Sequence, residues 1–310
     1  MNARSARSQP ACRIIGWDAA VDPRNNALAV GDLGVEGGPE ETVRTDGGER
    51  GPDGSDDARV LTVRGVVSPA NDEAIAETVT EWIGEVSPRC PILLCIDAPL
   101  GWPARLGPTL ANHTAGAALD GDAERLFRRA TDRDIRRRLG KTPLDVGADR
   151  IARTAYSVLG RIEALRRRVT REIRLALGRD AVRAMGGPTG GGDEPADCEL
   201  PIWLVESYPA AWFVSEGIDT KGYRPRRAGG RRGELFREVL SSLGWEGSRG
   251  WRIAAGDRIP EDEITRTADT LDAVACVYNG ADVWWCDNVP EPENREAARI
   301  EGWIWCKSPG

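Results

Sequence analysis

The chain has 310 residues, of which 40% are hydrophobic and 29% charged, a composition typical of a globular protein with one large domain or two small ones. No apolar run approaches the roughly 18 residues that a membrane span requires, which excludes an integral membrane protein. Seven cysteines without a CxxC pair, and a single histidine, His113, argue against a disulfide framework and against most zinc enzymes. We therefore expect a cytoplasmic protein with no membrane association.

The net charge of −7 conceals two basic segments in an otherwise acidic chain. Residues 121–180 contain 17 Lys and Arg against 9 Asp and Glu, and residues 221–232 contain six basic residues and no acidic one. This segregation favours a local patch for an anionic partner, and the backbone of a nucleic acid is one candidate. A solvated, arginine-rich helical surface explains the same pattern equally well.

The first third of the chain predicts three strands, a helix and a fourth strand. Three apolar stretches are typical of successive strands in an antiparallel meander, at 12–20, 25–33 and 58–67. Residues 1–11 are expected to form a disordered tail, and residues 34–57, rich in Gly and acidic residues, a flexible insertion. Asn71 then opens an amphipathic helix. The apolar run at 92–96 predicts a strand that is buried on both faces and ends at Asp97.

The remainder of the chain predicts helices around one further buried strand. Residues 104–184 are expected to form a helical basic cap and residues 185–199 a Gly-rich linker. A short strand at 201–209 then ends at Glu206. The last predicted elements are a helix at 234–244, a long helix at 261–285 and a terminal strand or hairpin arm at 301–307.

This order of elements is that of the ribonuclease H fold, an α/β fold with helices on both faces of a mixed five-stranded sheet. Three antiparallel strands come first and parallel strands follow, with a helical insertion between the fourth and fifth strands. We expect residues 12–307 to form a single ribonuclease H-like domain. The first and fourth strands of that fold are parallel neighbours, so Asp18 and Asp97 should project side by side from their C-terminal ends. Open α/β sheets bind their ligands at that edge.

Acidic residues at the predicted strand ends and in the last long helix are the candidate catalytic groups: Asp18, Asp97, Glu206, Asp269 and Asp272. Clustered carboxylates repel one another, and a divalent cation removes the conflict. Mg²⁺ and Mn²⁺ prefer such oxygen ligands, and two ions about 3.5–4 Å apart can activate water for phosphodiester cleavage. Other interpretations remain open. Asp18 and Asp97 are also suitable turn formers, Glu206 can pair with a cap arginine, and either helix aspartate can be solvated.

Basic and aromatic residues supply candidate contacts to a nucleic-acid strand. Arg128 and Arg129 are expected over the sheet edge, where they would hold a phosphate, with an ion pair inside the cap as the alternative. Lys221 and Arg224 would bind backbone phosphates and Tyr223 would stack on a base, unless this segment is only a basic loop.

Seven motifs in chain order, from about residue 12 to 306, together resemble the family called Domain of Unknown Function 429. They are IIGWDAA, CIDAPLGWP, FRRATDRDIRRRLGKTPLDV, VESYPAAWF, KGYR, DTLDAVAC and EGWIW. Members of that family are described as predicted nucleases of the ribonuclease H fold. The resemblance implies a metal-dependent nuclease in which Asp18, Asp97 and Asp272 bind Mg²⁺ or Mn²⁺. It carries over Glu206 and Asp269 less directly.

The leading hypothesis is a metal-dependent nuclease that hydrolyses phosphodiester bonds in DNA or RNA at a carboxylate-bound two-metal site. A non-catalytic nucleic-acid-binding or interaction protein on the same scaffold is the alternative. An actin-like or sugar-kinase-like phosphotransferase is a third hypothesis. It is weaker, because it needs a glycine-rich phosphate loop after the first strand and GWDAA has no glycine after Asp18.

Overall fold

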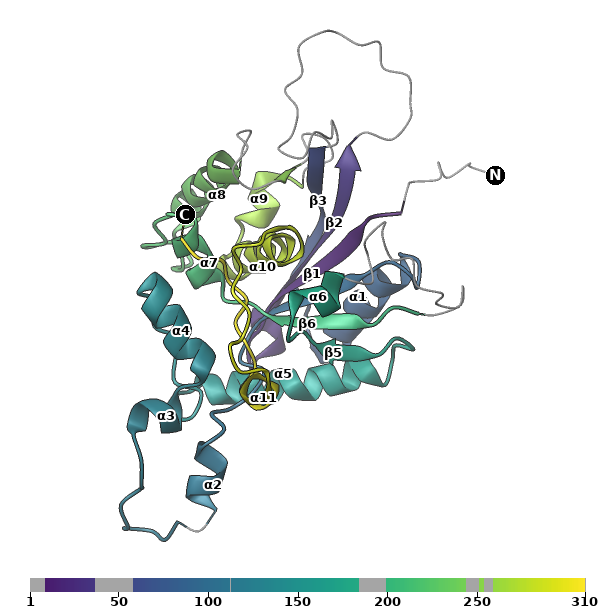
Figure 1. The fold of residues 1–310 in the computed structure, drawn as a ribbon. Coiled ribbons are helices and arrows are strands. Elements are labelled where there is room, and N and C mark those ends of the chain that lie inside the picture. The colour runs from purple at the N-terminus through teal and green to yellow at the C-terminus, as the bar shows by residue number, and fades with distance from the viewer. Residues whose placement is uncertain are drawn as a thin grey trace, which may run out of the picture.

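A seven-stranded mixed sheet forms the centre of the molecule in a computed structural model (Figure 1). The structure describes residues 9–36, 58–111, 113–183, 199–243, 251–253 and 259–309. The strands are β1 (Cys12–Asp18), β2 (Ala27–Glu36), β3 (Ala58–Val67), β4 (Ile92–Asp97), β5 (Ile173–Leu175), β6 (Ile202–Glu206) and β7 (Arg252–Ile253). Their order across the sheet is β5-β6-β4-β1-β2-β3-β7.

The sheet has the predicted mixture of directions. β1, β2 and β3 are antiparallel neighbours, whereas β4, β6 and β5 continue the sheet from β1 in parallel. The predicted number of five strands is wrong, because β5 forms one edge of the sheet and β7 forms the opposite edge. These strands have three and two residues, too few to show a period in the sequence.

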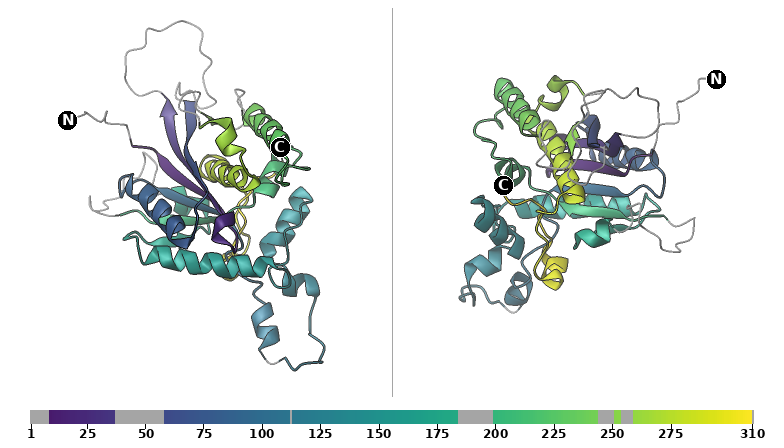
Figure 2. Two further views of the ribbon diagram at one scale, coloured as in Figure 1. Left: turned by 180° about the vertical axis from the view of Figure 1, so that it is seen from behind. Right: turned by 45° about the horizontal axis from the view of Figure 1, so that its top comes forward.

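Helices cover both faces of the sheet (Figures 1 and 2). They are α1 (Asp72–Gly84), α2 (Leu106–Leu110), α3 (Ala123–Phe127), α4 (Ala130–Leu139), α5 (Ile151–Arg166), α6 (Arg179–Arg183), α7 (Pro209–Ser215), α8 (Gly229–Leu243), α9 (Glu261–Ile264), α10 (Ala268–Trp285) and α11 (Arg295–Glu301). One face packs against α1 and α5, and the other against α10, with α7 and α8 beside it. No helix in the described part of the chain combines the length and apolarity needed to cross a membrane.

The segment expected to be a basic cap is divided between cap and core. In Figure 1, α2 and α3 extend away from the sheet. By contrast, α5 lies against the sheet, where Val158, Ile162 and Leu165 are buried beside α1, and β5 completes one sheet edge. Most of the predicted acidic insertion and Gly-rich linker lies outside the described residues, as does most of the N-terminal tail, although β2 extends to Glu36.

The C-terminal region differs from prediction in two respects. The helix predicted at 261–285 is two helices, because Thr267 starts a new one. The Thr267 hydroxyl accepts a hydrogen bond from the Thr270 N–H at 3.0 Å, and the Thr270 hydroxyl accepts one from the Thr267 N–H at 3.1 Å. The two bonds form a reciprocal cap at the helix N-terminus. The predicted strand at 301–307 is also absent from the described residues, where Ile304 forms only a single parallel bridge to Glu206.

Helix α10 lies very close to β1 because glycines occupy their interface. A Cβ atom at Gly16 would lie 2.2 Å from the carbonyl oxygen of Ala273, and one at Gly280 would lie 2.6 Å from Cγ2 of Ile14. No side chain can be accommodated at either contact without movement. This contact brings the first turns of α10, with Asp269 and Asp272, to the end of β1 that carries Asp18.

We predict that Gly280→Ala lowers the free energy of unfolding by about 1–3 kcal/mol, because the new methyl group overlaps Ile14 and Cys95. Gly160→Ala is the matched control. It also lies inside a helix, but no atom lies within 4 Å of its added Cβ, so it should stabilise the protein by about 0.5–1 kcal/mol. Urea denaturation followed by circular dichroism measures both. Equal effects of the two substitutions would contradict the close packing of α10.

Candidate active site

Asp18 and Asp97 are direct neighbours at the same edge of the sheet. The parallel register of β1 and β4 pairs the two residues, and each is the last residue of its strand. Both side chains are half-buried, and neither forms an ion pair with any described residue. The arrangement predicted from the strand ends is therefore present.

Helix α10 adds two more carboxylates above this pair. Asp272 is only 1% exposed. The Tyr223 hydroxyl donates to its Oδ1 and Oδ2 atoms, at 2.8 and 3.0 Å, and Nη2 of Arg224 lies 3.2 Å from Oδ2. Asp269 is half-buried, in the first turn of the helix. The four aspartates from three elements thus form one group, named here the aspartate cluster.

The aspartate cluster carries more negative charge than its surroundings compensate. Burial raises the pKa of Asp18 well above its ordinary value, and the nearby Asp272 and Asp97 raise it further. Burial and Asp272 raise the pKa of Asp97 to about 7. Burial also raises the pKa of Asp269, and it raises the pKa of Asp272 to about 6. Arg224 opposes the rise in pKa at all four carboxyl groups, so it is the cation that the whole cluster shares.

The aspartate cluster borders a cavity of about 890 Å³. Asp18, Asp97 and Asp269 line it together with Glu206. Its other wall is basic and comes from several parts of the chain: Arg24, Arg129, Lys141, Arg224, Arg226, Arg232 and Arg266. An acidic floor beside basic walls suits an anionic ligand that is bound together with a cation.

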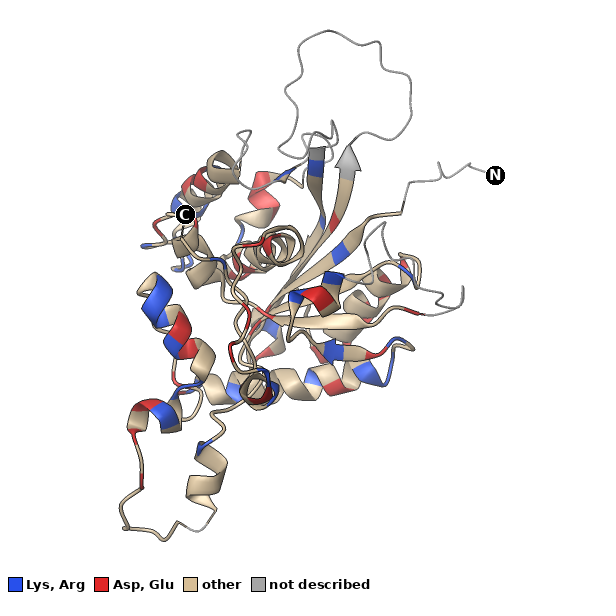
Figure 3. Ribbon diagram, in the orientation of Figure 1, with Lys and Arg blue, Asp and Glu red and all other residues tan. Residues whose placement is uncertain are grey.

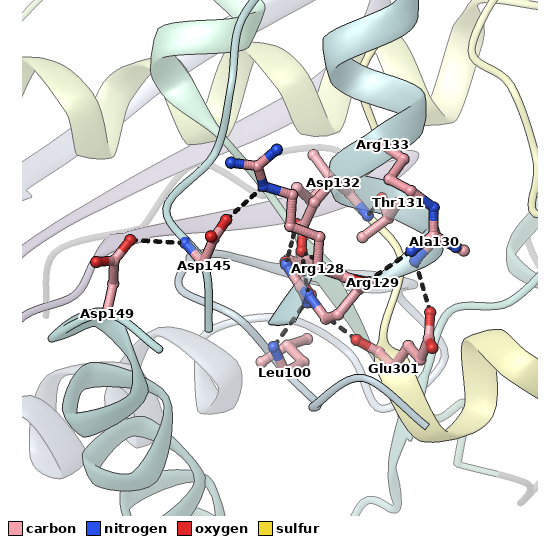
Figure 4. A network of polar contacts seen from close by, with 12 residues as sticks. Leu100, Arg128, Arg129, Ala130, Thr131, Asp132, Arg133, Asp145, Asp149 and Glu301 are labelled. Carbon is pink, nitrogen blue, oxygen red and sulfur yellow. Dashed lines mark hydrogen bonds and ion pairs between the residues drawn. The ribbon is translucent and has the colours of Figure 1, made fainter. Parts of the chain in front are cut away.

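Glu206 lies near the cluster but is fully engaged elsewhere. Nη2 and Nη1 of the buried Arg129 donate to its Oε1 and Oε2 atoms, at 2.7 and 2.8 Å, and the Leu100 N–H donates to Oε2 at 3.0 Å. Arg129 also forms a two-point contact with the buried Asp132 (Figure 4). Glu206 thus forms the ion pair with a cap arginine that the sequence analysis gave as the alternative to a catalytic role. Its two oxygens therefore anchor the cap to the sheet edge.

The C-terminal segment closes around this anchor. The side-chain carboxylate of Glu301 accepts a hydrogen bond from the Ala130 N–H at 2.6 Å (Figure 4). The backbone carbonyl oxygen of Glu301 accepts one from Nη1 of Arg129 at 2.9 Å. The next residue, Gly302, has a φ of +77°, and a Cβ there would lie 2.6 Å from Oε2 of Glu206. Only glycine fits this turn, which buries the arginine and its partners.

The other predicted phosphate and base contacts are placed unequally. Arg128 pairs with Asp145 and Glu124, at 2.5 and 2.6 Å, and does not line the cavity. Lys221 is exposed and also lies outside the cavity lining. Tyr223 is buried with its hydroxyl on Asp272, so it is not free to stack on a base. Arg224 does line the cavity.

The basic residues of 121–180 do not form a uniformly positive surface. Figure 3 shows acidic residues interspersed with them along α4 and α5. Many are paired locally, as Arg137 and Arg138 are with Asp134, at 2.6 and 2.7 Å. The solvated helical face explains much of this segment, and the basic residues of the cavity come mainly from loops.

Two buried arginines that hold the site loops were missed in the sequence. Arg161 donates to the carbonyl oxygens of Ala20 and Val21, at 2.6 and 2.9 Å, and so fixes the chain that follows Asp18. Arg232 donates to four carbonyl oxygens, those of Tyr223, Pro225, Thr265 and Arg266. Each arginine lies on the apolar face of an amphipathic helix, which was the available signal.

The donor chemistry of the aspartate cluster fits a divalent cation. Its carboxylates are the hard oxygen donors that Mg²⁺ and Mn²⁺ prefer. Burial, together with neighbouring carboxylates, raises their pKa values, and an added cation would favour their ionised forms. As the side chains stand, no three His, Cys, Asp or Glu residues of the described ranges are placed to ligate one ion. Asp272 in particular is directed to Tyr223 and Arg224. An ion ligated by Asp272 together with Asp18 and Asp97 would therefore require a rearrangement around Asp272.

Comparison with known proteins gives one match, to the family described as "Protein of unknown function (DUF429)", over residues 51–297. The match includes Asp97, Glu206, Asp269 and Asp272 but neither Asp18 nor the EGWIW motif, so it is shorter than the resemblance over 12–306 suggested. The place of Asp18 in the site therefore rests on its geometry. No curated protein and no solved structure matches the chain.

The buried network around Arg129 should dominate local stability. We predict that Arg129→Met lowers the free energy of unfolding by about 3–5 kcal/mol, because Glu206 and Asp132 would remain buried without their partner. The adjacent Arg128 pairs with more exposed carboxylates, so Arg128→Met should cost about 1 kcal/mol or less. Urea denaturation distinguishes the two. Similar losses from both substitutions would contradict the anchoring role of Arg129.

The aspartate cluster should lower stability as the pH rises. In the folded protein the pKa of Asp97 is raised to about 7, so folding is favoured while this group is protonated. That contribution is complete below the ordinary pKa of about 3.9 and is lost as the pH rises through about 7. We predict that Asp97→Asn raises the free energy of unfolding by on the order of 1–3 kcal/mol at pH 8 and changes it little at pH 4.

Urea denaturation in the presence of a chelator measures this pH dependence. Asp287→Asn is the control with the opposite sign, because Arg183 lowers the pKa of the exposed Asp287. An Asp97→Asn variant that is less stable than the natural protein at pH 8 would refute the account of the cluster.

Proposed function

The chain belongs to the DUF429 family, and we propose that it is a nuclease that hydrolyses phosphodiester bonds of DNA or RNA with Mg²⁺ or Mn²⁺. One observation carries the proposal. Asp18 and Asp97 lie side by side without an ion-pair partner among the described residues, in a cavity whose other walls are basic. A site of this charge pattern suits a phosphate group and a cation bound together.

Each part of the cavity has a separate task in this proposal. Asp18 and Asp97, with Asp272, supply the oxygen ligands for the divalent cation. The cation, when bound, makes water a stronger nucleophile and offsets charge on the phosphate. Arg24, Lys141 and Arg226 line the basic wall and would hold the nucleic-acid backbone.

The sheet order supports a ribonuclease H-like assignment of the fold. The central strands β3-β2-β1-β4-β6 have the predicted order and directions, with carboxylates at the ends of β1 and β4 and on helix α10 above them. In this proposal β5 and β7 are additions to that core.

The two rival functions explain less of the cavity. A silent nucleic-acid-binding module needs the basic wall but gains nothing from a destabilising group of buried aspartates. A phosphotransferase of the actin-like or sugar-kinase-like kind needs a glycine-rich loop after β1, and residues 19–26 contain no glycine.

The test is a cleavage screen with single-stranded, duplex, hybrid and branched DNA and RNA, with Mg²⁺ or Mn²⁺. We expect Asp18→Asn and Asp97→Asn to reduce cleavage by roughly 100-fold or more, since even outer partners of metal ligands contribute 10–100-fold. Asp287→Asn, at an exposed position outside the cavity lining, is the control and should leave cleavage unchanged.

Two results would contradict the proposal. One is full activity of a folded Asp18→Asn variant. The other is binding of nucleic acid by the natural protein with no cleavage in either metal, which would support the silent binding module.

A further inference from the structure

Two arginine–carboxylate pairs border the same cavity, and they differ in how firmly they are held. Arg129 contacts Glu206 through two hydrogen bonds, and both side chains are buried. Arg224 contacts Asp272 through one nitrogen at 3.2 Å, and its side chain is 60% exposed. A single exposed contact is weak, whereas a buried two-point pair is costly to separate. The Arg224–Asp272 pair is therefore the one that can open.

We propose that a divalent cation and Arg224 compete for Asp272, so that the arginine leaves when the cation binds and contacts the substrate phosphate instead. This exchange rests on the proposed function. It accounts for the rearrangement that the present side-chain positions require before three carboxylates can share an ion.

The backbone of this loop allows the exchange without a change in fold. Arg232 donates to the carbonyl oxygens of Tyr223 and Pro225, the residues on either side of Arg224. Arg232 is buried, so the loop is fastened at both flanks while the Arg224 side chain reaches into solvent. The guanidinium can therefore move by rotation of its own side chain.

The Tyr223 hydroxyl keeps Asp272 in place during the exchange. It donates to both carboxylate oxygens, at 2.8 and 3.0 Å, and it is buried. An ionised carboxylate has about four acceptor positions, so one hydroxyl leaves room for a cation. The Tyr223 ring also lies 5.4 Å from the Arg224 guanidinium, a cation–π contact that does not depend on Asp272.

Electrostatics drives the guanidinium away once an ion is bound. A divalent cation at the aspartate cluster brings two positive charges beside Arg224, and like charges at such short range repel. Arg224 lines the cavity, so a phosphate bound there offers it a new partner in the planar geometry that arginine favours.

The experiment measures Mn²⁺ binding by calorimetry without substrate, and separately the hydrolysis of bis(p-nitrophenyl) phosphate at saturating Mn²⁺. Arg224→Gln should bind Mn²⁺ about 3–10-fold more tightly, because the competing charge is gone. Its kcat/KM should fall by at least about 10-fold, because the phosphate contact is lost. A merely structural role of Arg224 would weaken both.

Two variants control for charge and for position. Arg224→Lys keeps the charge, so its Mn²⁺ affinity should stay within about twofold of the natural protein's. Arg266→Gln removes another exposed cation from the same cavity and should change Mn²⁺ affinity by less than about twofold, since its guanidinium donates to the Ser68 hydroxyl at 3.1 Å and not to the aspartate cluster. If Arg224→Gln does not fold, Arg224→Ala takes its place.

The possible results separate the two levels of the proposal. Absence of Mn²⁺ binding in the natural protein and in Arg224→Gln would contradict the proposed function itself. Mn²⁺ binding that Arg224→Gln leaves unchanged or weakens would overturn the exchange alone. In an Asp272→Asn background, adding Arg224→Gln should tighten Mn²⁺ binding by less than it does in the natural protein, because only the longer-range effect of Arg224 on Asp18, Asp97 and Asp269 remains. An undiminished gain would place the competition at another carboxylate.

Discussion

Direct contact between the backbones of helix α10 and strand β1 determines the rest of the site. Gly16 on the strand packs against the backbone carbonyl of Ala273 on the helix, and Gly280 on the helix packs against the side chains of Ile14 and Cys95. Because the helix lies this close, its first turns reach the edge where β1 and β4 end, and four aspartates from three separate segments come together. A larger residue at either glycine would move Asp272 away from Asp18. The charge crowding at the site is thus a consequence of backbone packing.

Carboxylates on the two sides of the cavity differ in whether their negative charge is paired with an arginine. At the end of β6, Arg129 satisfies both oxygens of Glu206 and both of Asp132, and the result is a closed, buried anchor. At the ends of β1 and β4, the carboxylates repel one another and one partly exposed arginine serves all of them. We expect the first arrangement to stabilise the fold and the second to lower the free energy of unfolding as the pH rises. A group that proteins retain at such a cost is a candidate for function.

Much of the site could be predicted, because strand ends are visible in a sequence. The apolar run that ends at Asp97 marks a buried strand, and the ribonuclease H-like order of elements predicted that Asp18 would lie beside Asp97, as it does. The break before α10 was also visible in principle, as a Thr267-x-x-Thr270 cap. The partners of Glu206 and Tyr223 were not, because they come from loops and helices whose positions only tertiary packing determines. The edge strands β5 and β7 were not predicted, because a strand of two or three residues shows no hydrophobic periodicity in the sequence.

The central claim is that Asp18 and Asp97 at the ends of β1 and β4, which form no ion pair with a described residue, hold a divalent cation. Anomalous diffraction from Mn²⁺-soaked crystals tests it most directly. The account predicts a Mn²⁺ peak in contact with the carboxylates of both Asp18 and Asp97, with the Arg224 guanidinium displaced from Asp272. Crystals that contain Mn²⁺ elsewhere, while this pair remains without an ion and Arg224 stays on Asp272, would contradict it.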